Sequence, residues 1–207
     1  FSGSITASFG ELQYLQYLWL DYNYLEGTLP SAIANCSSLV HLSANGNSLG
    51  GVIPAAIGAL PKLQVVSLSQ NNLTGSLPSS MFCNVSVYSP SLRIVQLGFN
   101  LFTDVVGPES EDCFSILQVL DLQRNRIRGV FPSWLTKVAT LTMLDFSGNL
   151  FSGVIPPEIG SMLRLEQLRV ADNSFSGVIP EKIKQCSSLR VLDLEGNGFS
   201  GEIPAFL

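Results

Sequence analysis

Apolar residues recur along this chain in one fixed order that always ends at an asparagine. The order is L-x-x-L-x-L-x-x-N with minor replacements, as at residues 39–47, 63–71 and 189–197, and most successive asparagines are 24 residues apart. The eight motif asparagines are Asn23, Asn47, Asn71, Asn100, Asn125, Asn149, Asn173 and Asn197. A fixed period of about 20 to 50 residues indicates stacked repeats, so the sequence predicts a solenoid.

The x-L-x-L part of the motif predicts a short strand, because alternate residues of a strand point to the same side. A strand this short is stable only as one rung of a stacked parallel sheet. The motif asparagine follows the strand, and its amide can bond backbone groups that the turn leaves unpaired. We therefore expect the asparagines to be structural. Inward-facing apolar positions include Leu18, Leu20, Leu120, Leu122, Leu144 and Phe146.

The segment after the asparagine reads x-[LF]-x-G-x-[IL]-P, as in residues 150–156. Glycine permits a sharp turn, and proline fixes φ and has no N–H for a sheet. The next pattern, P-x-x-I-G-x-L at residues 54–60, spaces apolar residues three apart. This spacing predicts a short helical or 3₁₀ segment on the outer face.

Together these elements resemble the plant-type extracellular leucine-rich repeat, whose consensus is close to L-x-x-L-x-L-x-x-N-x-L-x-G-x-I-P-x-x-I-G-x-L-x-x-L. Residues 141–164 match it nearly throughout, and G-x-I-P marks the plant-type subclass. The chain looks most like part of the ectodomain of a plant leucine-rich-repeat receptor-like kinase. The resemblance implies an α/β solenoid, a right-handed superhelix with a parallel concave sheet and short convex helical segments. It also implies partners on the concave or lateral face.

The repeat boundaries predict a single solenoid domain over residues 1–207, with a partial repeat at residues 1–12 followed by eight repeats. Neither end carries the polar cap that repeat arrays need. We interpret the chain as an uncapped fragment of a longer array. The alternative is a natural short protein with open ends.

Composition narrows the classes of function. Lys and Arg number 11 against 16 Asp and Glu, and the net charge is −5. With no basic runs, this argues against nucleic acid and against direct contact with an anionic membrane. No stretch approaches a membrane-spanning length, and no signal peptide is visible. The sequence contains no nucleophile–base pair, phosphate loop, kinase motif or metal-ligand cluster, so we expect no catalysis, cofactor or metal in this segment.

The cysteines fall into two kinds. Cys36 and Cys186 each stand six residues after a motif proline, in an inward slot that larger apolar residues fill elsewhere, so we expect them to be buried small apolar residues. Cys83 and Cys113 each follow a proline by five residues in consecutive repeats. Equivalent positions of adjacent rungs lie about 5 Å apart, within disulfide range. We predict a Cys83–Cys113 bond.

The centre of the array is irregular. Asn71 and Asn100 are 29 residues apart instead of 24, which places an insert at about residues 84–91. Residues 102–112 also depart from the pattern, because Asp104 replaces the usual glycine. The irregular stretch is interpreted either as a tolerated loop or as a binding or orientation feature.

Three N-x-S/T sequons begin at Asn35, Asn72 and Asn84. They predict N-glycosylation, and beside a predicted disulfide they favour an oxidising compartment. We therefore expect the extracellular side of the plasma membrane, with the parent protein anchored by a transmembrane helix outside this segment.

Outward strand positions at the N-terminal end carry an unusual number of aromatic residues. Exposed Trp and Tyr mark contact surfaces, so this group is a candidate partner-binding site. The alternative is packing on a preceding repeat or on one another. The candidate residues are Tyr17, Trp19, Asp21, Tyr22, Tyr24 and His41.

A second candidate surface lies in the C-terminal half, where Arg124, Arg126 and Arg169 stand among carboxylates. The Arg124-x-Arg126 pair is similar to the element with which some peptide-sensing members of the family hold a peptide's C-terminal carboxylate. Guanidinium groups suit carboxylates by bidentate hydrogen bonding. The alternative is a solvated ion-pair network with the neighbouring acids, which are Asp121, Asp145, Asp172, Asp193 and Glu195.

The function implied by the resemblance is extracellular recognition of a peptide, a small molecule or a protein, together with a co-receptor ectodomain. Signalling would pass through a serine/threonine kinase domain outside this segment. One alternative is a secreted leucine-rich-repeat inhibitor of microbial cell-wall hydrolases. Another is a receptor-like protein with an anchor but no kinase.

Overall fold

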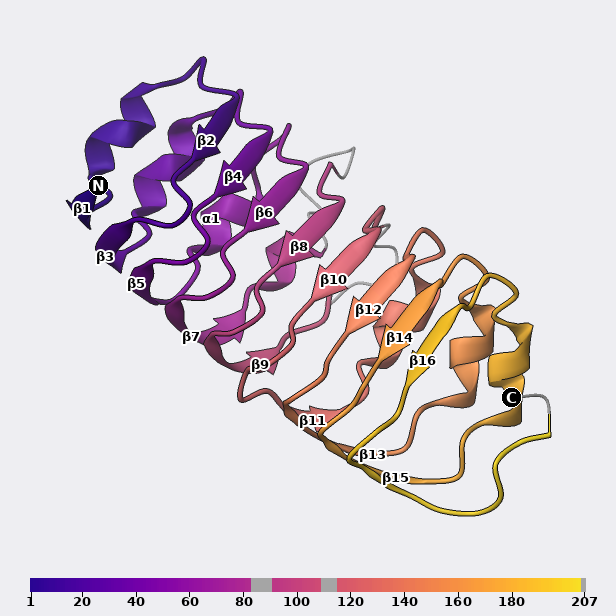
Figure 1. The fold of residues 1–207 in the computed structure, drawn as a ribbon. Helices are drawn as coiled ribbons and strands as arrows, with labels where there is room; N and C mark the ends of the chain where they lie inside the picture. The colour runs from indigo at the N-terminus through magenta and orange to yellow at the C-terminus, as the bar shows by residue number, and fades with distance from the viewer. Residues whose placement is uncertain (83–90, 109–114, 206–207) are drawn as a thin grey trace.

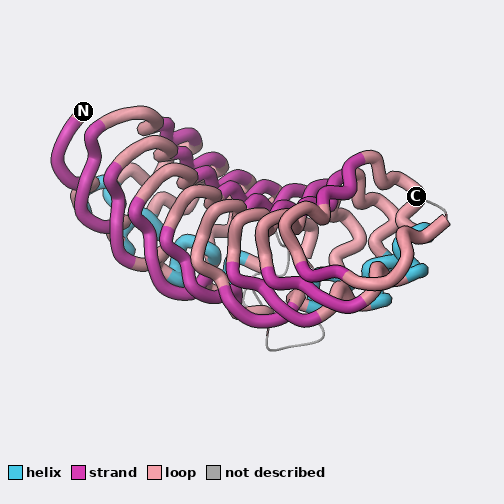
Figure 2. The backbone as a smooth tube through the Cα atoms, turned by 60° about the horizontal axis from the view of Figure 1, so that its bottom comes forward, coloured by secondary structure: helices cyan, strands magenta, loops and turns pink. Residues whose placement is uncertain are grey.

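The computed structural model describes residues 1–82, 91–108 and 115–205. Each repeat forms one coil, and the coils stack along a curved axis with the two termini at opposite ends (Figures 1 and 2). The predicted leucine-rich-repeat solenoid is confirmed.

The concave side is one parallel sheet of eight strands, one from each repeat (Figure 1). Equivalent residues stand opposite one another; for example, Leu120 pairs with Leu144 and Leu144 with Leu168. The middle residue of each strand points into the core, and its two neighbours face outward. In spatial order the strands are β2 (Tyr17–Trp19), β4 (His41–Ser43), β6 (Val65–Ser67), β8 (Ile94–Gln96), β10 (Val119–Asp121), β12 (Met143–Asp145), β14 (Gln167–Arg169) and β16 (Val191–Asp193).

A second set of strands lies beside the concave sheet, in the glycine-containing segment for which the sequence predicts only a turn. It forms two parallel sheets. The first contains β1 (Ser2–Ser4), β3 (Tyr24–Thr28), β5 (Ser48–Gly51), β7 (Asn72–Leu77) and β9 (Leu101–Val105). The second contains β11 (Arg128–Val130), β13 (Leu150–Gly153), β15 (Ser174–Gly177) and β17 (Gly198–Phe199).

The glycine of this segment allows close stacking of successive lateral strands. Gly177 has φ +74°, and a Cβ there would lie 2.9 Å from Val154 Cγ1, so a larger residue would collide with the preceding repeat. Where Asp104 replaces the glycine, the β7–β9 register shifts, and β9 and β11 belong to different sheets. Residues 102–105 nevertheless belong to a strand, so the departure expected from residue 102 onward is a shift in pairing and not a loss of the strand.

Short helical segments cover the convex side, as predicted. Each one after the first begins directly after a motif proline, whose extended conformation ends the lateral segment. The described segments are the 3₁₀ helices η1 (Ala7–Glu11), η2 (Ser31–Asn35), η3 (Ser79–Met81), η4 (Ser133–Lys137), η5 (Pro157–Ser161) and η6 (Glu181–Gln185), and the α-helix α1 (Ala55–Gly58).

The motif asparagines form the expected ladder. The Asn71 amide Nδ2 donates to Ala44 O at 2.9 Å and Leu68 O at 3.1 Å, and Oδ1 accepts from Leu49 N at 3.0 Å. Each amide thus joins its own strand end to the preceding repeat. The residue before each motif asparagine has positive φ. In some repeats it is glycine, as at Gly46, but in others it is not, for example Tyr22 at 52° and Arg124 at 50°, and there the left-handed conformation has some cost.

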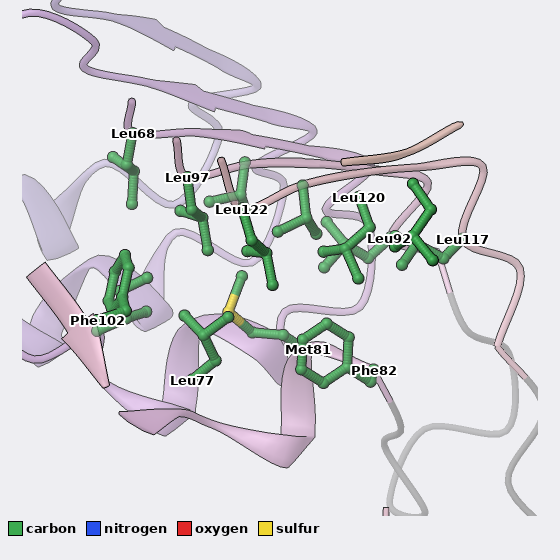
Figure 3. Packing of buried hydrophobic residues seen from close by; sticks show 14 of the residues in the cluster. Leu68, Leu77, Met81, Phe82, Leu92, Leu97, Phe102, Leu117, Leu120 and Leu122 are labelled. Atoms are coloured by element: carbon green, nitrogen blue, oxygen red, sulfur yellow. The ribbon is translucent and has the colours of Figure 1, made fainter. Parts of the chain in front are cut away.

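The core between the strands and the helices is a continuous apolar ribbon (Figure 3). In Figure 3, Leu97 and Leu122 from the concave side point toward Leu77 and Met81 near the convex side. In the C-terminal repeats phenylalanine replaces leucine at the position two residues after the motif asparagine. Phe151 stacks on Phe175 with ring centroids 6.0 Å apart, which adds aromatic packing to the buried area.

Cys36 and Cys186 are buried, as expected. Each thiol donates to a carbonyl of the preceding repeat, Cys36 Sγ to Phe9 O at 3.0 Å and Cys186 Sγ to Ile159 O at 3.1 Å. Burial raises the pKa of both thiols. Cys83 and Cys113, with their predicted disulfide, lie outside the described residues.

Candidate ligand-binding face

The concave face is formed by the eight-stranded sheet, and most of the candidate site residues predicted from the sequence lie on it or at its strand ends. On each strand the first and third residues face outward because the second is buried in the core. Parallel pairing aligns these residues into columns that run the length of the sheet. The first column reads Tyr17, His41, Val65, Ile94, Val119, Met143, Gln167 and Val191. The second column reads Trp19, Ser43, Ser67, Gln96, Asp121, Asp145, Arg169 and Asp193.

Tyr17, Trp19 and His41 form a compact group at the N-terminal end, hereafter the aromatic cluster. The Tyr17 and Trp19 rings stack with centroids 5.4 Å apart, and His41 meets the Trp19 ring edge-on at 5.6 Å. Tyr17 nevertheless remains 50% exposed and Trp19 62% exposed. The two rings pack on each other, as the alternative interpretation expected, and still present an open aromatic surface.

The other residues of the first candidate site have separate positions. Tyr22 occupies the left-handed turn, with its ring against Gly46. Tyr24 begins the lateral strand β3 and is 83% exposed. Asp21 Oδ1 accepts three hydrogen bonds from the next repeat, from Ser43 Oγ at 2.6 Å and from Asn45 N and Nδ2 at 2.7 and 2.8 Å. Its carboxylate therefore helps hold two rungs together.

The C-terminal half of the face contains a cavity of about 410 Å³, hereafter the charged pocket. Four carboxylates and two guanidinium groups line it, so its formal charge is negative. These residues are Arg124, Asp145, Arg169, Asp172, Asp193 and Glu195. Asp121 stands next to Asp145 in the same column.

The two arginines of the pocket do not pair with its carboxylates. Arg169 Nη1 donates to Gln167 Oε1 at 2.5 Å, and the Arg124 guanidinium lies over the Phe99 ring, 5.7 Å from its centroid. Ion pairs found among the described residues, such as Arg190–Glu166 at 3.6 Å, do not include either arginine. The ion-pair network considered as an alternative is not formed in this conformation.

Burial raises the pKa of the Asp121 carboxyl. Hydrogen bonds from Gln123 oppose this shift, while the nearby Asp145 carboxylate adds to it and Arg169 partly offsets it. Asp145 is only 4% exposed. Its Oδ1 accepts from Ser147 N at 2.9 Å, and its second oxygen accepts no hydrogen bond from the described residues. The pocket therefore holds a buried carboxylate with unused bonding capacity.

The Arg124 and Arg126 side chains both point to solvent, but only Arg124 lines the charged pocket. The Arg126 backbone N–H donates to Phe102 O at 2.9 Å, where the chain turns toward the lateral sheets. The pair thus spans the border between the concave and lateral surfaces. The sequence reasoning missed the Phe99 ring, which lies beneath the Arg124 guanidinium. The repeat pattern contains a signal for it, because Phe99 directly precedes a motif asparagine and that turn position faces outward.

Two of the three sequons are described, and both asparagines are exposed. Asn35 ends the convex helix η2 and Asn72 begins the lateral strand β7. Asn84 lies outside the described residues. Glycans on Asn35 and Asn72 would leave the concave face open.

Within the described ranges, no three His, Cys, Asp or Glu residues group as metal ligands would, and no helix is long and apolar enough to cross a bilayer.

Leucine-rich-repeat family models match most of the chain. One matches residues 90–151, and another matches residues 14–36, 38–60, 62–84, 164–186 and 188–207. The chain belongs to the leucine-rich repeat family. This family, together with the structures described next, confirms the resemblance to plant receptor ectodomains.

Two solved structures are similar to this leucine-rich-repeat array over 98% of its length. The plant peptide hormone receptor RGFR1 in complex with RGF2 is 34% identical, with a TM-score of 0.88. The Arabidopsis receptor kinase HAESA, in complex with the peptide hormone IDA and the co-receptor SERK1, is 32% identical, also with a TM-score of 0.88. The array covers 32% and 33% of those chains, about a third of each.

A curated relative from Oryza sativa subsp. japonica, described as a probable inactive leucine-rich repeat receptor kinase XIAO, is 51% identical over 56 residues. The match covers 27% of this chain and 5% of that protein.

Proposed function

We propose that this leucine-rich-repeat array is an extracellular recognition segment of a plant receptor kinase, and that it binds a peptide along its concave face. The observation that carries the proposal is the face itself: aromatic side chains point outward at one end of the eight aligned strands and charged side chains at the other, and its pocket arginines have no acidic partner among the described residues. Exposed aromatic and arginine side chains are the residues that most often anchor a bound partner.

The two similar receptor structures support a peptide as the ligand, since both hold peptide hormones. The HAESA complex also contains a co-receptor, and we propose a co-receptor ectodomain as a second partner here. We place the segment on the outer side of the plasma membrane, with the anchor and the kinase domain in other parts of the parent protein and glycans on Asn35 and Asn72.

Within this function, Arg124 and Arg126 are proposed to hold the peptide's C-terminal carboxylate. Both guanidinium groups are exposed, and each could donate two parallel hydrogen bonds to a carboxylate. A peptide with a free C-terminus should then bind more tightly than its amidated form.

The test is selection from a displayed library of random dodecapeptides on the immobilised chain. The control is a triple variant that removes one aromatic, one basic and one acidic side chain from the concave face without changing its net charge: Trp19→Ser, Arg124→Ser and Glu195→Ser. We expect peptides that the unchanged chain enriches and the triple variant does not. Equal enrichment on both proteins, or none on either, would contradict peptide recognition by this face.

The arginine pair is then tested with a selected peptide in free-acid and amide forms. Arg124→Ala with Arg126→Ala should weaken the free acid at least about tenfold and the amide much less. Arg164→Ala, an exposed arginine outside the face, is the matched control. Unchanged affinity in the double variant removes the carboxylate role.

A further inference from the structure

We propose that the partner is an extended basic peptide, with a lysine or arginine side chain entering the charged pocket and an apolar residue about seven positions away on the aromatic cluster. This inference rests on the proposed peptide recognition and specifies its chemistry.

The first argument is charge. The C-terminal half of the concave face carries five carboxylates against two guanidinium groups, once Asp121 is counted with the charged pocket. The pocket arginines are directed to Gln167 and Phe99, and neither forms an ion pair with these carboxylates among the described residues. A surface with this balance attracts a cationic partner and repels an acidic one.

The second argument is unused bonding capacity inside the pocket. One oxygen of the buried Asp145 carboxylate accepts no hydrogen bond from the described residues. Ser147 Oγ, also in the pocket lining, is buried without a hydrogen-bond partner within the described part of the chain. A buried hydroxyl costs stability when it is left unpaired. An ammonium or guanidinium group from a ligand would donate to both oxygens and remove this cost at Ser147.

The third argument is the path between the two ends of the face. The aromatic cluster lies on β2 and β4, and the centre of the charged pocket lies on β12 and β14. These positions are five rungs apart, about 24 Å at the usual strand spacing. An extended chain covers that distance in about seven residues. The first column of outward positions between them is an apolar strip of Val65, Ile94 and Val119, and Met143 continues it into the charged pocket.

The aromatic cluster supplies the second anchor. The Trp19 ring of this stacked pair is more than half exposed. The rings have no charged partner among the described residues, because the nearby Asp21 carboxylate accepts hydrogen bonds from Ser43 and Asn45. This end therefore suits an apolar or proline side chain. The face is polar at one end and apolar at the other, so it fixes the direction of the bound peptide.

The experiment sequences the enriched dodecapeptides and measures the affinity of a consensus peptide by calorimetry. We expect Lys or Arg at one position and an apolar residue about seven positions away. Asp145→Asn with Asp193→Asn should weaken that peptide at least tenfold. The control, Glu11→Gln with Glu158→Gln, removes the same charge from convex helices and should change affinity less than twofold.

A second acid pair, Asp172→Asn with Glu195→Gln, uses exposed residues and keeps the test decisive if the Asp145 variant does not fold. This inference is overturned if the enriched peptides are neutral or acidic, or if neither acid-pair substitution changes their affinity. Either result would still support peptide recognition by the concave face. If no peptide is enriched at all, both proposals fall.

Discussion

The two halves of the concave face share one scaffold and differ in what they present. In both halves the motif asparagine ties adjacent repeats together, as Asn71 does in the N-terminal half and Asn149 in the C-terminal half. The second outward column is uncharged from β2 to β8 and charged from β10 to β16, and the aromatic residues of both columns lie on β2 and β4. Because the fold tolerates both surfaces, folding alone does not require the charges of the second half.

The halves also use their strand-end acids differently. Asp21 accepts hydrogen bonds from Ser43 and Asn45 of the next repeat, so its carboxylate helps to stabilise the stacking of the two repeats. Asp145 bonds within its own repeat, to Ser147 N, and keeps one oxygen available. The comparison indicates that the N-terminal carboxylate is structural, whereas the C-terminal carboxylates are available to a ligand.

The largest expected effect tests whether the scaffold is the same in both halves. Asn71→Ala and Asn149→Ala should each lower the free energy of unfolding by about 2–4 kcal/mol, because each leaves buried backbone groups unpaired. Chemical denaturation measures the loss. Ser48→Ala and Ser174→Ala, which are exposed, are the controls and should change it little. A large loss in only one half would refute a common scaffold.

The next effect separates the halves by salt. Binding of the selected peptide should weaken roughly tenfold between 0.05 and 0.5 M NaCl, because salt screens the exposed carboxylates of the charged pocket. Trp19→Ala should weaken binding about tenfold at either salt concentration, since it removes apolar and aromatic contact. Titration calorimetry at both concentrations measures this. Salt-independent binding would place the anchor outside the charged half.

A smaller effect concerns Asp121 in the unliganded chain. Its folded pKa is raised above the ordinary value of 3.8, so the native state binds the proton more tightly than the unfolded state does. Stability is therefore lost as pH rises through the window between these two values. Asp121→Asn should raise Tm at pH 7 by about 2 °C, with no gain at pH 3.

Thermal unfolding followed by circular dichroism at both pH values measures the change. Asp172→Asn, an exposed acid of the same face, should leave Tm nearly unchanged. A fall in Tm for Asp121→Asn at pH 7 would show that the carboxylate is stabilising, contrary to this account.

The smallest effect uses the cysteines, one buried thiol lying in each half. Cys36 and Cys186 should resist a thiol reagent equally in the native protein, because burial raises the pKa of both. Denaturation without reduction should release two thiols if Cys83 and Cys113 are bonded. Four reactive thiols would exclude that disulfide, and unequal native reactivity would show that one half is more loosely packed.

Much of the fold could be predicted because it is set by the repeat itself. The spacing of Asn71 and its equivalents predicted the strand, the turn and the amide ladder, and the slot after the motif proline predicted burial of Cys36 and Cys186. The lateral sheets were missed because Gly153 and its equivalents permit a turn and an extended strand equally well. Only the stacking of the next repeat decides between them.

The candidate site was harder to predict, since side-chain direction depends on neighbours. Alternation placed Trp19 and Asp145 on the concave face, but it could not show that Tyr24 starts a lateral strand. Nor could charge alone show that Arg169 turns to Gln167 rather than to an aspartate. These outcomes depend on contacts between repeats, which the sequence pattern does not specify.

The most direct test of the central claim is a crystal structure of the chain with a peptide selected from the library. The account predicts an extended peptide on the concave face, with a basic side chain between Asp145 and Asp193 and an apolar residue against Trp19. A peptide bound to the lateral or convex surface, or one whose basic residue points away from the charged pocket, would contradict it.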